Sequence, residues 1–146
     1  MMDVARRSRL RAASGALTAA ENSPTLVISP PGYSLAVVTL NVTTLTVPDA
    51  DDEVDFYLQT CYDQAQTWND LANVHFANGD SAVTRFIVIH PEASATNITP
   101  SAGAIADNTV SATRPLGWAL RIRATVTGGT APTYAYNAEV YLVRYS

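Results

Sequence analysis

The residues best placed to do chemistry stand together in one acidic run, Asp49-Ala50-Asp51-Asp52-Glu53-Val54-Asp55. Its carboxylates repel one another unless water or a cation lies among them, and Ca²⁺ prefers such hard oxygen ligands. The spacing does not match an EF-hand loop, which needs glycine at its sixth position and glutamate at its twelfth. Two interpretations therefore stand. One is a solvated acidic turn between two strands, and the other is a calcium site at Asp49, Asp51, Asp52 and Glu53.

The other reactive side chains are few. His75 is out of phase with the apolar residues on either side of it and is predicted to face outwards or into a contact with a second sheet, while His90 ends a strand just before a proline. The one cysteine, Cys61, falls in an apolar strand and is predicted to be a buried, inert thiol. Neither imidazole has neighbours that fit a Ser/His/Asp triad, a zinc set or a paired general acid and base. The sequence thus predicts no enzyme and, apart from calcium, no cofactor.

The charge of the chain is unevenly spread. Residues 1–11 hold four arginines, Arg6, Arg7, Arg9 and Arg11, and one aspartate, which gives +3, whereas residues 12–146 hold five arginines and twelve acids, which gives −7. A basic leader on an acidic body predicts an arm, residues 1–22, that contacts a negatively charged neighbour; the alternative is a solvated terminus. The body has no basic face, so direct binding of nucleic acid is not expected.

The elements that must position these residues are predicted to be strands. Apolar and polar side chains alternate with a period of two, and Gly, Pro and Asn turns separate the runs. With no amphipathic helix, this pattern predicts one antiparallel β-sandwich over residues 23–146, jelly-roll or immunoglobulin-like, with seven to eight strands and an extended N-terminal arm. A closed barrel is the alternative. The predicted strands are 25–29, 34–47, 54–62, 71–77, 83–90, 118–127 and 134–142.

Three details of this pattern can be checked. Strands 118–127 and 134–142, joined through Gly128-Gly129, are predicted to form a hairpin in which Glu139 lies within reach of Arg121 and Arg123. Strand 83–90 is apolar on both faces, which predicts a central position or a covered outer face. The irregular segment 91–115 is predicted to be a functional loop or to hide an edge strand around 104–110.

The composition and the positions of the tyrosines bear on where the protein resides and which surfaces it exposes. No segment approaches the ~20 apolar residues of a membrane span. The start of the chain is only faintly similar to an export signal, so a protein made in the cytoplasm and not exported is predicted. Tyr57 and Tyr141 are out of phase with the core and are predicted to be interface residues rather than sugar platforms.

Two segments carry a resemblance to a known family. The first runs from Val54-Asp55-Phe56-Tyr57-Leu58-Gln59-Thr60 through Trp68-Asn69-Asp70-Leu71-Ala72 to His75-Phe76, and the second is Leu116 to Tyr134 with its Thr127-Gly128-Gly129-Thr130-Ala131-Pro132-Thr133-Tyr134 tip. Both resemble small proteins encoded among the structural genes of tailed bacteriophages. The turn at 62–68 lacks the glycines of those relatives. The resemblance implies a virion component and brings no catalytic residues with it.

These observations lead to three hypotheses of function. The first is a head decoration or cement protein of the virion, a homo-oligomer that binds the major capsid protein or other virion subunits through its arm and sandwich edges. The second is a carbohydrate-binding or adhesion sandwich of a tail or fibre. The third is a tail or head–tail connector subunit, which shares the fold and differs in its assembly partner.

Overall fold

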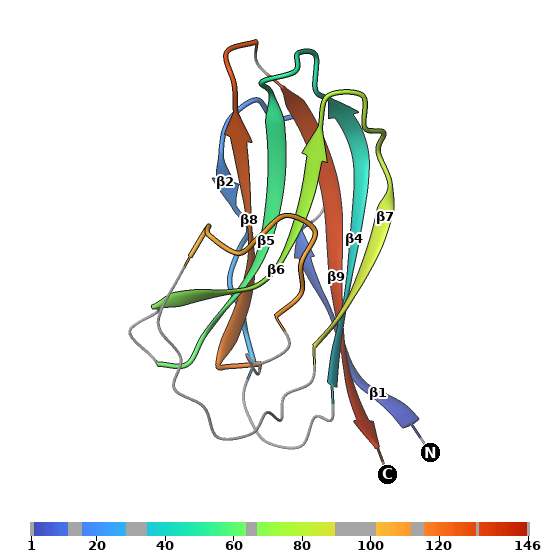
Figure 1. Ribbon diagram of the computed structural model, residues 1–146. Helices are drawn as coiled ribbons and strands as arrows, with labels where there is room; N and C mark the ends of the chain where they lie inside the picture. Colours follow the sequence, from blue (N-terminus) through green and yellow to red (C-terminus); the bar gives the residue numbers. More distant parts are fainter. Residues whose placement is uncertain are drawn as a thin grey trace.

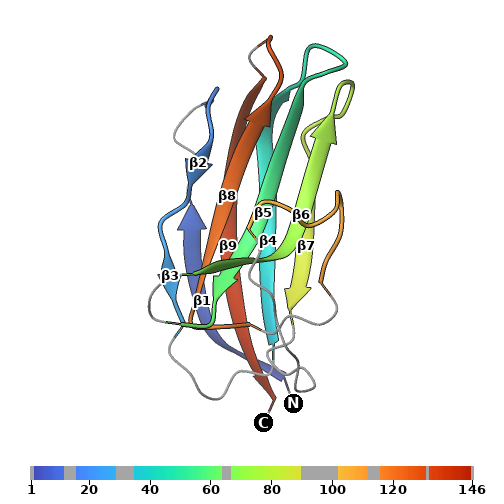
Figure 2. The same cartoon turned by 60° about the vertical axis from the view of Figure 1, so that its left-hand side comes forward.

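The computed structural model describes residues 2–11, 16–28, 35–63, 67–89, 102–111, 116–130 and 132–145. Over these residues the chain forms two antiparallel sheets packed face to face, as Figures 1 and 2 show, which confirms the predicted β-sandwich. The first sheet has the order β1-β9-β4-β7 and the second β2-β8-β5-β6, with β3 also paired to β8. The strands are β1 Met2–Arg11, β2 Glu21–Asn22, β3 Leu26–Val27, β4 Leu35–Thr46, β5 Glu53–Cys61, β6 Trp68–Ala77, β7 Thr84–Ile89, β8 Ala119–Thr127 and β9 Thr133–Tyr145.

The core lies between the sheets and follows the period-two pattern. Alternate residues of β4, β5, β8 and β9 turn inwards because successive side chains leave a strand on opposite faces. At one end of the core Phe56 packs edge-on against Phe76, Tyr134 and Tyr136, with ring centroids 5.9, 5.5 and 5.1 Å away. The part of the chain that the structure describes has no helix of a length and apolar character suited to crossing a membrane.

The predicted hairpin of residues 118–142 is wrong. β8 belongs to one sheet and β9 to the other, so Gly128–Thr130 begins a crossover between the layers. Each strand buries one apolar face. It can do so as part of a hairpin within one sheet or as a member of the opposite sheet, so alternation alone does not distinguish these two arrangements. Glu139 consequently lies far from its predicted partners and pairs with Arg7, whose Nη2 is 2.8 Å from Glu139 Oε2.

The central position predicted for strand 83–90 is also wrong. Among the residues that the structure describes, β7 is the edge strand of its sheet and pairs only with β4. Ile87 and Ile89 turn into the core, but on the outer face Phe86 and Val88 leave 71% and 46% of their surface exposed. The apolar outer face is therefore not covered by any described part of this chain.

The predicted N-terminal arm is extended, and its described part lies along the sandwich. β1 pairs antiparallel with β9 from Met2 opposite Tyr145 to Arg11 opposite Ala138, and Leu10 is buried in the core. The following segment crosses to the other sheet, where β2 and β3 pair with β8. Residues 2–11 and 16–28 thus add an edge strand to each layer, and Figure 2 shows β1, β2 and β3 together along one side.

Candidate functional site

The most polar buried region lies on the outer face of β5 and β6. In this pair Asp55 stands opposite His75 and Tyr57 opposite Asn73. Segment 102–111 runs across these strands, as the orange trace in Figure 1 shows, and covers them. Although they are on an outer face, Asp55 and Asn73 are therefore buried, with 6% and 2% of their surface exposed. Buried polar groups are costly unless they find partners, so their contacts are the informative ones.

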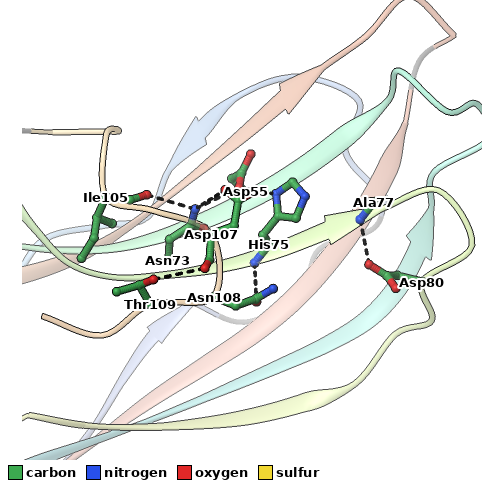
Figure 3. A network of polar contacts seen from close by, with 9 residues as sticks. All are labelled: Asp55, Asn73, His75, Ala77, Asp80, Ile105, Asp107, Asn108 and Thr109. Carbon is green, nitrogen blue, oxygen red and sulfur yellow. Dashed lines mark hydrogen bonds and ion pairs between the residues drawn. The ribbon is translucent and has the colours of Figure 1, made fainter.

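Asp55 is the centre of this region (Figure 3). Its Oδ1 lies 2.8 Å from His75 Nδ1 and accepts a hydrogen bond from Asn73 Nδ2 at 3.1 Å. Asp107, from the covering segment, brings its Oδ1 to 3.7 Å from His75 Nδ1. The backbone N–H of His75 donates to Asn108 Oδ1 at 3.0 Å. Two strands and one loop therefore converge on a cluster of two carboxylates, an amide and an imidazole.

The charge around His75 changes its acid–base behaviour. Burial lowers the pKa of its imidazole, but the hydrogen bond with Asp55 and the charges of Asp55, Asp107 and Glu53 act in the opposite direction. Together they outweigh burial, so the pKa of His75 is raised above its ordinary value. Positive charge is favoured at this position, whether it comes from a proton or from another cation.

Asp70 holds the covering segment in place. Its carboxylate accepts hydrogen bonds from the backbone N–H groups of Gly103, Ala104 and Ile105 at 2.8, 2.8 and 3.1 Å. Gln59 Nε2 donates to the same carboxylate at 2.9 Å. Further along, Val110 makes an isolated bridge with Ala72 of β6. The edge strand predicted around 104–110 is thus reduced to this single bridge in the described part of the segment.

The carboxylates of the acidic run 49–55 lie in different environments in the structure. Asp52 is fully buried and ties two turns together: its Oδ2 accepts from Asp49 N at 3.2 Å and its Oδ1 from Thr130 N at 3.3 Å, while Thr130 Oγ1 donates to Asp49 Oδ2. Asp51 is exposed. Among the described residues, Glu53 converges with Asp55 and His75, and not with Asp49, Asp51 and Asp52. The predicted calcium ligands therefore do not form one group of converging oxygen atoms.

The predicted interface residues lie on both outer faces. On β9, Tyr141 donates to Glu139 Oε2 at 2.8 Å, and the guanidinium of Arg7 lies 5.3 Å from its ring centre. Tyr57 is half-buried on β5, where burial and the nearby carboxylates raise the pKa of its phenol. The structure does not bring these two tyrosines together, because they belong to different sheets.

The arginines of the N-terminal strand find partners within the chain. Arg6 Nη1 donates to the carbonyl of Val27 at 3.2 Å. Arg7 pairs closely with Glu139, and Arg9 approaches the same carboxylate at 3.9 Å. The side chain of Arg11 and the whole of His90 lie outside the described residues. Cys61 is buried as predicted, and burial, followed by the charge of Asp63, raises the pKa of its thiol.

Sequence reasoning missed the polar region on β5 and β6 because its members are far apart in the chain. Asn69, Asp70 and Asn73 did offer a signal, since three buried polar residues interrupt what otherwise reads as an apolar strand. Asp107 offered none, because a lone aspartate in an irregular segment is ordinary. Comparisons of the chain with models of protein families, with curated proteins and with solved structures found no match.

Proposed function

We propose that this chain is a structural subunit of a tailed-bacteriophage virion, a decoration protein that docks on the shell through the free edge of β7. The observation that carries the proposal is the outward-facing pair Phe86 and Val88 on β7, an edge strand that pairs with β4 on one side and with no described residue on the other. Large apolar side chains exposed on a sheet edge are an aggregation hazard unless a partner covers them. The resemblance of residues 54–143 to small phage structural proteins supplies the context.

The outer face next to β7 is graded in polarity. Val37 of β4 stands between Val88 and Tyr141, and Thr39 stands between Phe86 and Glu139. The face thus runs from apolar side chains at the free edge to Arg7 and Arg9 on the opposite edge strand. A partner strand adding to β7 gains backbone hydrogen bonds and covers Phe86 and Val88, while the charged side fixes orientation.

The N-terminal strand takes a secondary part in this proposal. Arg7 and Arg9 already approach Glu139, which reduces the positive charge that they offer to a neighbour. Their side chains remain 63% and 66% exposed, so each is still accessible to an acidic surface of a shell subunit or a sister copy. Many weak contacts of this kind, repeated over neighbouring capsomers, stabilise a shell by avidity.

The test uses particles made in a host strain that carries the gene, separated by density and analysed by quantitative mass spectrometry. The double variant Phe86→Ser/Val88→Ser is expected to fold, because both side chains are exposed, and to be lost from the particles. The matched control is Val27→Ser, which removes a side chain that is 59% exposed on the other sheet. Normal incorporation of the double variant contradicts docking through β7.

The number of copies of this chain per particle distinguishes a shell decoration protein from a connector subunit. A decoration protein is present in proportion to the major shell protein, whereas a tail or head–tail connector subunit is present as one ring per particle. The proposal expects the first result. A ring-like copy number replaces the decoration role with the connector role, and absence from particles removes the virion proposal.

One observation favours a second candidate function, carbohydrate binding. A groove of about 330 Å³ on the outer face of the first sheet is lined by Arg9, Thr39, Asn41, Asn137 and Glu139. Hydroxyl, amide, carboxylate and guanidinium groups are the kind of groups that recognise sugars, and Glu139 in this lining accepts a hydrogen bond from Tyr141 on the same face. A glycan array tests this alternative with the full chain, and Asn41→Ala should abolish any binding that depends on the groove.

A further inference from the structure

The cluster around Asp55 has the donor groups of a metal site. Glu53, Asp55 and His75 each offer a ligand atom, and these atoms lie within 4.8 Å of one another. Asp107 adds a third carboxylate, with its Oδ1 3.7 Å from His75 Nδ1. Acidic groups near a histidine are common without a metal, so the neighbouring Asn73 is needed to decide what the cluster can hold.

Asn73 is buried, and its side chain points into the cluster with an unusual set of contacts (Figure 3). Three oxygens surround its Nδ2: Asp55 Oδ1 at 3.1 Å, the Ile105 carbonyl at 3.5 Å and Asp107 Oδ1 at 3.5 Å. Its Oδ1 has no hydrogen-bond partner within the described structure. An orphaned buried acceptor is costly, and three oxygens around one donor mark a point of strongly negative potential.

Rotating the amide by half a turn exchanges its oxygen and nitrogen. The orphaned Oδ1 then joins Asp55, Asp107 and the Ile105 carbonyl around the same point. In an empty site this arrangement is repulsive, because four oxygens face one another without a donor. With a divalent cation among them it is favourable, because the charge of the ion holds the four oxygens together. The oxygen that lacks a partner gains one, and Nδ2 gives up its three contacts in exchange.

The cluster is open to solvent at Asp107, whose side chain is 65% exposed. A groove of about 340 Å³ opens beside His75 and Asn108, between the end of β6 and the β7 side of the sandwich. Arg85 lines this groove as well and adds one opposing charge at its wall. Against it stand the carboxylates of Glu53, Asp55 and Asp107, so the balance of charge at the cluster remains negative.

We propose that Asp55, His75, Asp107 and Asn73, with Glu53 and the Ile105 carbonyl, bind one divalent transition-metal ion. Carboxylates combined with an imidazole suit Zn²⁺ and Mn²⁺, whereas Ca²⁺ takes oxygen ligands and gains little from His75. The ion joins segment 102–111 to β5 and β6, so its role is to fasten that segment onto the sheet. The site does not depend on where the chain docks.

The experiment uses the full chain after chelator treatment and dialysis. ZnCl₂, MnCl₂ and CaCl₂ are titrated separately by calorimetry, and thermal unfolding is followed with and without each ion. One Zn²⁺ or Mn²⁺ per chain is expected, with Zn²⁺ the tighter of the two by the Irving–Williams order and Ca²⁺ the weakest. The bound ion should raise the unfolding temperature, since it binds only the folded chain.

Two variants and one control locate the ion. His75→Gln removes the imidazole, and Asp107→Asn removes a carboxylate whose side chain is 65% exposed, so the second variant should fold even if the first does not. Each is expected to weaken Zn²⁺ binding by at least about tenfold. The control Asp51→Asn removes an exposed carboxylate of the acidic run and should leave binding unchanged.

Absence of binding for all three ions overturns the proposal, and so does Zn²⁺ or Mn²⁺ binding that survives both His75→Gln and Asp107→Asn. Binding that is lost only in Asp51→Asn would move the site to the acidic run. Tight Ca²⁺ binding that is insensitive to His75→Gln contradicts the assignment of a transition metal.

Discussion

Asp52 and Gly128 meet where the β4–β5 turn touches the crossover from β8 to β9. Gly128 has a φ of +112°, and a Cβ built on it would lie 2.0 Å from Asp52 Oδ1. Gly128→Ala therefore combines an unfavourable backbone conformation with a clash, and should destabilise the fold by about 2–4 kcal/mol. Urea denaturation measures the loss. Gly129→Ala is the control, because a Cβ there meets nothing within 4 Å; equal effects of the two substitutions would contradict the argument.

Glu139 connects the N-terminal strand to β9 through charge. Hydrogen bonds from Tyr141 and Arg7 lower its pKa below the ordinary value of 4.5. A group with a lowered folded-state pKa contributes stability above its unfolded pKa, and the contribution is lost as the pH falls through the folded value. Glu139→Gln should therefore be less stable than the wild type at neutral pH, and the difference should close in acid.

Denaturation at low salt over a pH series measures this difference. High salt should shrink it, because the pair is exposed and screened. Tyr141→Phe keeps the Arg7–Glu139 pair and should retain the part of the effect that depends on that pair. A difference that stays constant from neutral to acid pH would show that charge at Glu139 contributes nothing.

At the scale of the strands, the sequence predicts which side chains of a strand face the core better than it predicts which strands pair. The inward positions of β4 and β5 follow from alternation, since every second residue must leave the water. Assigning β8 and β9 to one hairpin fails, because β8 pairs with β5 and β9 with β4, and alternation within a strand does not name its partner. The Asp55–Asn73–His75 cluster escapes prediction for a similar reason, as it depends on the covering segment 102–111.

β1 illustrates how much one strand contributes. It covers the edge of β9, the longest strand, and places Leu10 in the core. Removing residues 2–11 should destabilise the sandwich by at least about 2–5 kcal/mol through the loss of Leu10 alone. It also leaves the edge of β9 unpaired, so the truncated chain should self-associate.

Denaturation together with light scattering tests both effects of the truncation. The control replaces Arg6, Arg7 and Arg9 with glutamine, which removes the charge and keeps the strand. If the truncated chain unfolds at the same urea concentration as the wild type, β1 does not belong to the cooperative unit. If the glutamine variant behaves like the truncation, charge rather than strand pairing holds the segment.

Over the whole molecule, the two ends of the described chain are neighbours. Met2 pairs with Tyr145, and both views place the N- and C-termini side by side. Pairing β1 with β9 is consequently the most expensive contact in chain entropy, because it closes a loop of nearly the entire sequence. Folding that depends on such distant pairings is expected to be slow.

A circular permutant turns this cost into a measurable rate. A short flexible linker joins Tyr145 to Met2, and the chain is opened at Gly79, an exposed turn residue with open space around it. The β1–β9 pair then becomes a local hairpin, so refolding should be faster than in the wild type. The unfolding rate should change little if that pair is already formed in the transition state. Stopped-flow refolding measures both rates, and a permutant with the same opening but a linker too short to preserve the β1–β9 register is the control.

A permutant that reaches the same fold but refolds no faster would mean that β1 docks only after the rate-limiting step, with the two sheets already closed around the core.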